Sequence, residues 1–162
     1  MPHPVRADLE ALIGALQTAR IDFVVVGGAA AVLHGAPITT QDLDIVHSRT
    51  PENVRRFLEL LANLEATVRG RDLRPTAEHL AGPGQLNLST SLGPLDPLGT
   101  LHDGRGYEEL LPHSIVLSDG ASQIRVLDLE TLISVKASTG RARDKLTLPI
   151  LLAIRDRLDA RK

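Results

Sequence analysis

The order of apolar and polar positions predicts a chain in which helices and short strands follow one another. Residues 5–20 carry their large apolar side chains at helical spacing, which predicts an amphipathic helix. Residues 21–26 form a short β-branched run, the pattern of a buried strand. Two glycines end this run, and residues 29–35 predict a short helix of small residues that stops near Pro37.

The rest of the chain shows the same alternation of elements. Thr50 and Pro51 mark a helix start, because threonine caps helix N-termini and proline suits the first helical position. The other expected elements are a strand over residues 42–46, a short strand with a loop or brief helix in residues 66–84, two strands around Gly93 and Pro94, one or two helical turns in residues 106–114, two strands around Asp119 and Gly120, a helix from Asp128 to Gly140, and a last helix with Pro149 near its start or kinking it.

These elements predict a fold that combines helices with a small β-sheet. The 162 residues, 43% of them hydrophobic, suit a single domain over residues 1–162 with an ordinary core. Neither an internal repeat nor a low-complexity segment interrupts the pattern.

Composition excludes several classes of function. Aromatic residues make up only 2% of the chain, so stacking on bases cannot be a major binding mode. Cysteine is absent, which excludes disulfides, thiol catalysis and cysteine–zinc sites. The net charge of −2 gives no sign of a general nucleic-acid coat. No apolar signal core or membrane-length run is present, so we expect a cytoplasmic protein without membrane contact.

Two acids separated by one apolar residue, Asp42 and Asp44, stand out in the second predicted strand. Positions i and i+2 share one face of a strand, so both carboxylates project the same way while Leu43 points into the core. Neighbouring carboxylates repel, and a divalent cation such as Mg²⁺ removes that repulsion. The alternative is structural, with Asp42 capping a turn and Asp44 in a surface ion pair.

Gly27 and Gly28 lie directly between the first strand and the following helix. Such a turn exposes backbone N–H groups and a helix N-terminus, which favour phosphate. It also serves as an ordinary tight turn. Neither the Walker loop nor the dinucleotide-binding spacing is present.

In this order, Gly27, Gly28, Asp42 and Asp44 resemble the motif of the nucleotidyltransferase fold of the polymerase beta superfamily. That motif is an apolar strand ending in Gly-Gly or Gly-Ser, followed after a short interval by Asp-apolar-Asp or Glu. Within the superfamily the chain is similar to small bacterial nucleotidyltransferases related to the AbiEii abortive-infection toxins. The similarity extends over residues 21–152 and rests on the segments GGAAAVLHG, TTQDLD, GPLD and LETLISVKASTGRARD. The resemblance implies an α+β fold, with a small mixed β-sheet flanked by helices and further helices at the C-terminal end.

The resemblance implies roles for three acids. Asp42, Asp44 and Asp96 would be catalytic and would bind Mg²⁺ or Mn²⁺, with Asp96 on the side of the attacking hydroxyl. Taken alone, Asp96 also suits a turn between two prolines. Around the nucleotide the resemblance places Gly27, Gly28, Thr40, Lys136 and Arg141.

From the residues alone, two of these positions stay open. Lys136 lies on the apolar face of its helix, where it either snorkels to the rim or points at triphosphate oxygens. Arg141 and Asp144 have the spacing of an ordinary pair within one helix. The resemblance favours a phosphate contact for Lys136.

The activity implied is transfer of a nucleoside monophosphate from an NTP to a hydroxyl acceptor on RNA, protein or a small molecule. A link to toxin–antitoxin systems, with a cognate toxin or antitoxin as partner, is compatible with the resemblance. The alternative is a catalytically weak member of the fold that binds a nucleotide or a partner protein in an antitoxin-like role. Gly28 stands where the superfamily often has serine.

Overall fold

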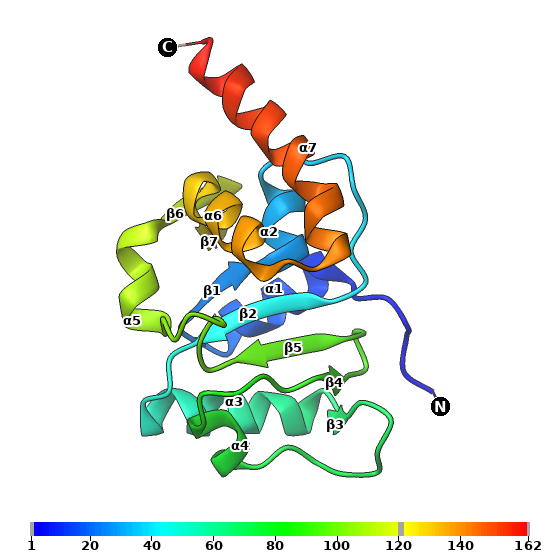
Figure 1. The fold of residues 1–162 in the computed structure, drawn as a ribbon. Coiled ribbons are helices and arrows are strands. Elements are labelled where there is room, and N and C mark those ends of the chain that lie inside the picture. Colours follow the sequence, from blue (N-terminus) through cyan, green and yellow to red (C-terminus); the bar gives the residue numbers. More distant parts are fainter. Residues whose placement is uncertain (1, 120–121, 162) are drawn as a thin grey trace.

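The computed structural model describes residues 2–119 and 122–161, and its elements follow the predicted alternation (Figure 1). In chain order they are α1 (Leu9–Thr18), β1 (Phe23–Val26), α2 (Gly27–Leu33), β2 (Leu43–His47), α3 (Pro51–Asn63), β3 (Thr67–Val68), α4 (Ala77–Ala81), β4 (Leu88–Ser89), β5 (Leu95–Leu98), α5 (Tyr107–Leu110), the 3-10 helix η1 (Leu111–His113), β6 (Ser114–Asp119), β7 (Ser122–Leu127), α6 (Leu129–Thr139) and α7 (Ala142–Asp159).

The strands form one mixed sheet in the order β3-β4-β5-β2-β1-β7-β6, which confirms the predicted fold class. β1 pairs with β2 in antiparallel and with β7 in parallel orientation, and β2 pairs with β5 in parallel. β1 therefore ends at the same end of the central strands where β2 and β5 begin. Asp42, Asp44 and Asp96 lie at this end of the strands.

The helix boundaries follow the local signals. Thr50 accepts a hydrogen bond from the backbone N–H of Asn53 at the start of α3, and Asp128 accepts one from Thr131 at the start of α6. Gly140 ends α6 with a φ of 70°, a conformation that favours glycine. The first helix is shorter than predicted and begins after residue 8, because Asp8 caps it.

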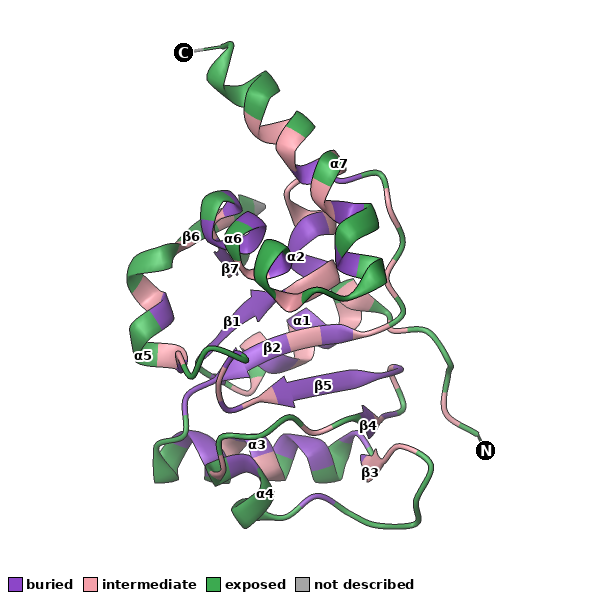
Figure 2. Cartoon of the chain, in the orientation of Figure 1, coloured by how far each residue is buried: buried purple, intermediate pink, exposed green. Residues whose placement is uncertain are grey.

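The central strands and the helix that follows β1 carry the core (Figure 2). Every residue of β1 is buried, and so are the three consecutive alanines Ala29–Ala31 of α2. Their small side chains allow α2 to pack closely on β1 and β2, so the glycines of its first turn are held against the end of these strands. Figure 1 shows α6 and α7 gathered beside α2.

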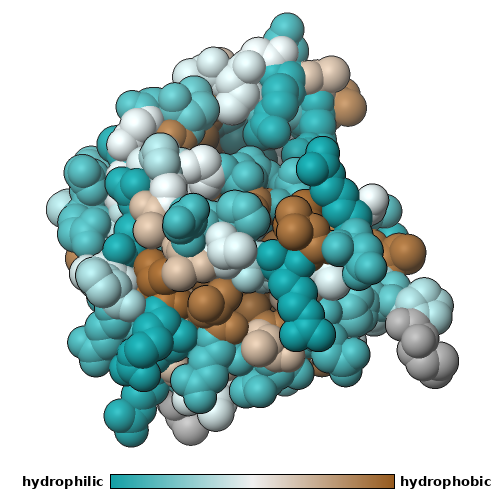
Figure 3. Space-filling view, turned by 90° about the horizontal axis from the view of Figure 1, so that it is seen from below, coloured by the Kyte–Doolittle hydropathy of each residue, from teal (hydrophilic) through white to brown (hydrophobic). Residues whose placement is uncertain are grey.

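The surface is mostly polar. Figure 3 shows one face as a largely hydrophilic surface with apolar side chains gathered near its middle. Within the described residues no helix is both long and apolar enough to cross a membrane.

The predicted strand pair around residue 119 is present as β6 and β7, while its turn residues Gly120 and Ala121 lie outside the described residues.

Candidate active site

Strand pairing brings two of the acids together. Asp44 is the second residue of β2 and stands opposite Asp96 of β5 in the parallel pair. On its other side it stands opposite Val26, the last residue of β1. The two carboxylates are 52 positions apart in the chain and become neighbours only because β2 and β5 pair in this register.

Asp42 reaches the same place from the loop before β2. It does not belong to the strand, contrary to our prediction, because β2 begins at Leu43. The Thr40 hydroxyl donates a hydrogen bond of 3.1 Å to the backbone carbonyl of Asp42 and so holds the turn that presents this carboxylate. Thr40 thus lies beside the predicted site.

One carboxylate oxygen from each of Asp42, Asp44 and Asp96 lies within 4.8 Å of the other two. Three converging carboxylates are the donor set that hard divalent cations such as Mg²⁺ and Mn²⁺ use in proteins. The residues present therefore fit a divalent ion. The structure brings all three predicted acids into one cluster.

The electrostatics of the cluster show the same crowding of negative charge. Burial, together with the nearby carboxylates of Asp96 and Asp42, raises the pKa of Asp44 to about 7. Burial also raises the pKa of Asp96, although the hydrogen bond and the charge of Arg69 act in the opposite direction. A cation at the cluster would favour the ionised forms of both carboxylates.

The two glycines are needed for close packing at this end of the strands. Gly27 has a φ of 64°, and a Cβ at this position would lie 2.5 Å from Oδ2 of Asp44. A Cβ at Gly28 would lie 2.8 Å from Oγ1 of Thr40. The helix begins at Gly27 itself, earlier than predicted, so the glycine pair forms its first turn against the acids.

A second polar cluster joins α6 to α7 beside the acids. The Lys136 side chain is 8% exposed, and its Nζ lies 3.1 Å from Oδ1 of Asp144, which is 1% exposed. Arg141 Nε lies 2.8 Å from Oδ2 of the same carboxylate, and Thr139 donates a hydrogen bond to it. Burial alone would raise the pKa of Asp144, but the hydrogen bonds from Thr139 and Lys136 outweigh it and lower the pKa to about 2.

This pairing settles where Lys136 points in this structure. The side chain neither snorkels to the rim nor extends freely into the cleft, but forms a buried ion pair with Asp144. The spacing of Arg141 and Asp144 gives the expected pair, while the burial of Asp144 was not predicted.

Sequence reasoning missed two arginines at the site. Arg69, which follows β3, lies 2.6 Å from Asp96 through its Nη2 atom, and Arg143 of α7 lines the cleft beside Asp42 and Asp44. The segment that holds Arg69 has no clear periodic pattern, so nothing local in the sequence indicated its partner. Arg143 follows Arg141 by two residues, and this pair of basic residues was the only signal available.

Two neighbouring hollows are both lined by Asp42 and Asp44. The larger, about 810 Å³, contains Asp42, Asp44 and Asp96 and extends over Arg69 toward residues 83–87 and 98–102. The smaller, about 310 Å³, lies over the glycine pair and Thr40, and contains neither Asp96 nor Arg69. Lys136 and Arg141 line both hollows. We call the smaller hollow the glycine side of the cleft, and the part of the larger hollow around Arg69 and Asp96 the arginine side, although Gly27 lines both hollows.

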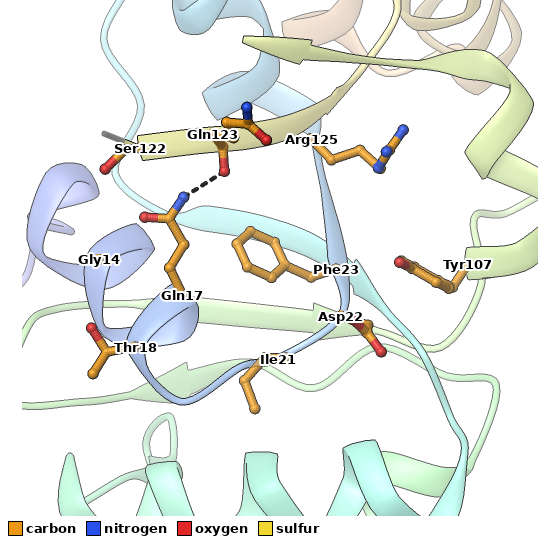
Figure 4. Close-up of a pocket in the computed structure, with 10 residues that line it drawn as sticks. All are labelled: Gly14, Gln17, Thr18, Ile21, Asp22, Phe23, Tyr107, Ser122, Gln123 and Arg125. Carbon is orange, nitrogen blue, oxygen red and sulfur yellow. Dashed lines mark hydrogen bonds between the residues drawn. The ribbon is translucent and has the colours of Figure 1, made fainter. Parts of the chain in front are cut away.

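Another hollow of about 600 Å³ lies at the opposite end of β1 (Figure 4). Phe23 and Tyr107 face it, and Gln17 donates a hydrogen bond to the backbone carbonyl of Gln123 across it. None of the predicted site residues lines this hollow, and among the described residues around it Asp22 carries the only carboxylate. It does not contain the acidic cluster.

Comparison with known proteins gives likenesses of structure. No protein-family model matches the chain, and a search of curated proteins gives no match. The lincosamide antibiotic adenylyltransferase LnuA, solved with lincomycin bound, is similar over 93% of this chain and 99% of its own, at 12% identity and a TM-score of 0.65. A candidate nucleotidyltransferase of Thermotoga maritima is similar over 90% of each chain, at 20% identity and a TM-score of 0.57.

A third solved structure belongs to the antibiotic-resistance factor ANT(2'')-Ia. It is similar over 94% of this chain and 90% of its own, at 12% identity and a TM-score of 0.54. The likenesses extend along almost the whole described chain while the sequences have diverged widely. Together with the mixed sheet and the strand register at the acids, they show that this chain has the nucleotidyltransferase fold.

Proposed function

We propose that this protein is a divalent-metal-dependent nucleotidyltransferase that transfers a nucleoside monophosphate from an NTP to a hydroxyl acceptor. The convergence of Asp42, Asp44 and Asp96 carries the proposal. Divalent ions held there by the three carboxylates would offset the negative charge of the triphosphate and stabilise the attacking and leaving oxygens. Without a cation these carboxylates, of which Asp96 is buried and the other two are half-buried, repel one another.

The reaction is an in-line substitution at the α-phosphorus. The acceptor oxygen forms a bond to phosphorus, the bond to the bridging oxygen breaks, and pyrophosphate leaves with the electron pair. The hydroxyl proton goes to the carboxylate of Asp96, which lines the larger hollow and not the smaller one over the glycine pair.

The two sides of the cleft suit different reactants. The glycine side offers the start of α2, Thr40 and the cations Lys136 and Arg141 to the triphosphate. For Lys136 this contact requires an exchange, because its ammonium group is paired with Asp144 in this structure. The arginine side, which holds Asp96, is left for the acceptor.

Of the three acceptor classes, a small molecule fits this cleft best. Its volume of about 810 Å³ lies within the range of small-ligand pockets, about 300–1,000 Å³. The similar structure of LnuA was solved with lincomycin, a small molecule, in place. RNA and protein acceptors, and a toxin or antitoxin partner, stay predictions from the sequence, and co-purification with a partner chain would test the last of these.

Label transfer from α-³²P-labelled NTPs tests the activity. Wild-type protein with Mg²⁺ or Mn²⁺ should label an acceptor from a panel of hydroxyl-bearing small molecules, total RNA and cell lysate, and EDTA should abolish the labelling. Asp96→Asn should reduce transfer by about a hundredfold or more while NTP-dependent thermal stabilisation persists. Asp72→Asn, which removes an exposed carboxylate, is the matched control.

The outcomes separate the enzyme from a binding protein. If wild type is stabilised by NTP and metal but labels no acceptor under any condition, the alternative of a catalytically weak nucleotide-binding protein replaces the transferase. If neither nucleotide nor metal stabilises wild type, both readings of the site fail.

A further inference from the structure

Arg69 forms an ion pair with one member of the acidic cluster, Asp96. Its Nη2 atom donates hydrogen bonds to Oδ1 of Asp96 at 2.6 Å and to the backbone carbonyl of Leu88 at 2.8 Å. Its backbone N–H donates to the carbonyl of Asn87. The arginine is therefore anchored along β4 and reaches over it to β5, where its guanidinium group contacts Oδ1 of Asp96.

Asp96 does not need Arg69 to hold its position. It lies within β5 between two paired strands and is 3% exposed, and its register opposite Asp44 is fixed by the β2–β5 ladder. What the pairing creates is a repulsion, since like charges directly opposite each other on neighbouring strands are unfavourable. Arg69 supplies the cation that offsets this repulsion.

A packing role alone does not account for this arginine. Its Nε atom is buried and has no hydrogen-bond partner within the part of the chain that the structure describes. An aliphatic side chain would fill the space without leaving a buried donor unpaired. The charge of the guanidinium group, rather than its bulk, is what the site uses.

The position of Arg69 links it to one side of the cleft. It lines the larger hollow together with Gln85, Asn87 and Asp96, and it is not part of the smaller hollow over the glycine pair. Two cations therefore compete for Asp96: the guanidinium group, which is already present, and any divalent ion bound by the three acids.

We propose that Arg69 is the resident counter-ion of Asp96, which neutralises this carboxylate on the acceptor side and competes with a divalent cation for it. The inference rests on the proposed function, because it assumes that the acidic cluster binds metal. It adds that the third carboxylate is the one at which metal binding is opposed, so occupancy there depends on displacing Arg69 from Oδ1.

Titration with Mn²⁺ in the absence of nucleotide tests this competition, with the free ion counted by electron paramagnetic resonance. Arg69→Gln removes the guanidinium group from Oδ1 of Asp96 and should lower the Kd for Mn²⁺ about tenfold, because the ion then binds this carboxylate without displacing a paired cation. Arg69→Lys keeps the charge and should stay within about threefold of wild type. Arg105→Gln removes an arginine whose ion pair with Asp103, at 2.8 Å, lies outside the cleft lining, and should change nothing.

A double-mutant cycle assigns the effect to the carboxylate. In an Asp96→Asn background, Arg69→Gln should no longer tighten Mn²⁺ binding, because the carboxylate for which the guanidinium group and the ion compete has been removed. If Arg69→Gln does not fold, the guanidinium resonance of Arg69 in ¹⁵N-labelled wild type provides the measurement, assigned by its loss in Arg69→Lys. That resonance should shift as Mg²⁺ is added.

Failure of the inference differs from failure of the proposed function. If wild type binds Mn²⁺ and Arg69→Gln binds it equally or more weakly, the competition is refuted while the metal site stands. A resonance of Arg69 that does not respond to Mg²⁺ bound by wild type refutes it likewise. If wild type binds no divalent cation, the proposed function and the inference fall together.

Discussion

Replacing Asp44 by asparagine should stabilise the metal-free protein. The folded protein raises the pKa of Asp44 from 3.8 to about 7, chiefly through burial and through the carboxylates of Asp96 and Asp42. Each pKa unit corresponds to about 1.4 kcal/mol, so ionised Asp44 lowers the free energy of unfolding by about 4 kcal/mol at pH 8. Asparagine has nearly the same shape and carries no charge to bury.

The sign follows from proton linkage. A carboxyl group whose pKa is raised on folding contributes stability that is complete below pH 3.8 and is lost as the pH rises through about 7. The advantage of Asp44→Asn over wild type should therefore be about 4 kcal/mol at pH 8 and about 2 kcal/mol at pH 5. Added Mg²⁺ and NTP should offset more than half of this advantage at pH 8, since only wild type gains the binding energy, about 2.7 kcal/mol at a hundredfold excess over Kd.

Urea denaturation in EDTA between pH 5 and pH 8, followed by circular dichroism, measures this difference, because the chain has no tryptophan for fluorescence. Asp72→Asn, at an exposed position, serves as control and should match wild type at every pH. The reasoning is refuted if wild type in EDTA is as stable as Asp44→Asn at pH 8. It is also refuted if the difference between the two does not change with pH.

Three further changes probe the surroundings of the site. Gly27→Ala should lose about 1–3 kcal/mol of stability, because Gly27 has a φ of 64° and the added Cβ would lie 2.5 Å from Oδ2 of Asp44. The control Gly14→Ala, whose Cβ meets nothing within 4 Å, should gain up to about 1 kcal/mol, and equal melting temperatures of the two variants would contradict this. Lys136→Met should lose about 3 kcal/mol in urea denaturation, because it leaves the buried Asp144 carboxylate without its ammonium partner; a loss below about 1 kcal/mol would mean that the pair adds little. The lowered pKa of Asp144, about 2, gives stability that is present above pH 3.8 and lost on acidification, so wild type should lose about 2 kcal/mol more than Asp144→Asn between pH 5 and pH 2, and parallel acid titrations would speak against it.

Local signals in the sequence were enough for the elements and for part of the site. Thr50 and Asp128 start helices as predicted, and Gly140 ends one, because capping depends on a few neighbouring residues. The spacing of Gly27 and Asp44 predicted that a glycine turn and an acid belong together. In the structure β2 runs antiparallel to β1 and begins beside its end, so the chain returns to the glycine turn.

The sequence by itself thus determined the kinds and order of elements, and its resemblance to a known fold implied the mixed sheet and the acids near a glycine turn. Only the tertiary structure decided that Asp96 stands opposite Asp44, that Lys136 turns to Asp144, and that Arg69 reaches Asp96. These contacts depend on which strands become neighbours, in what register, and on how one helix packs on the next. Such choices arise from burial and pairing across the whole chain, and a window of neighbouring residues does not contain them.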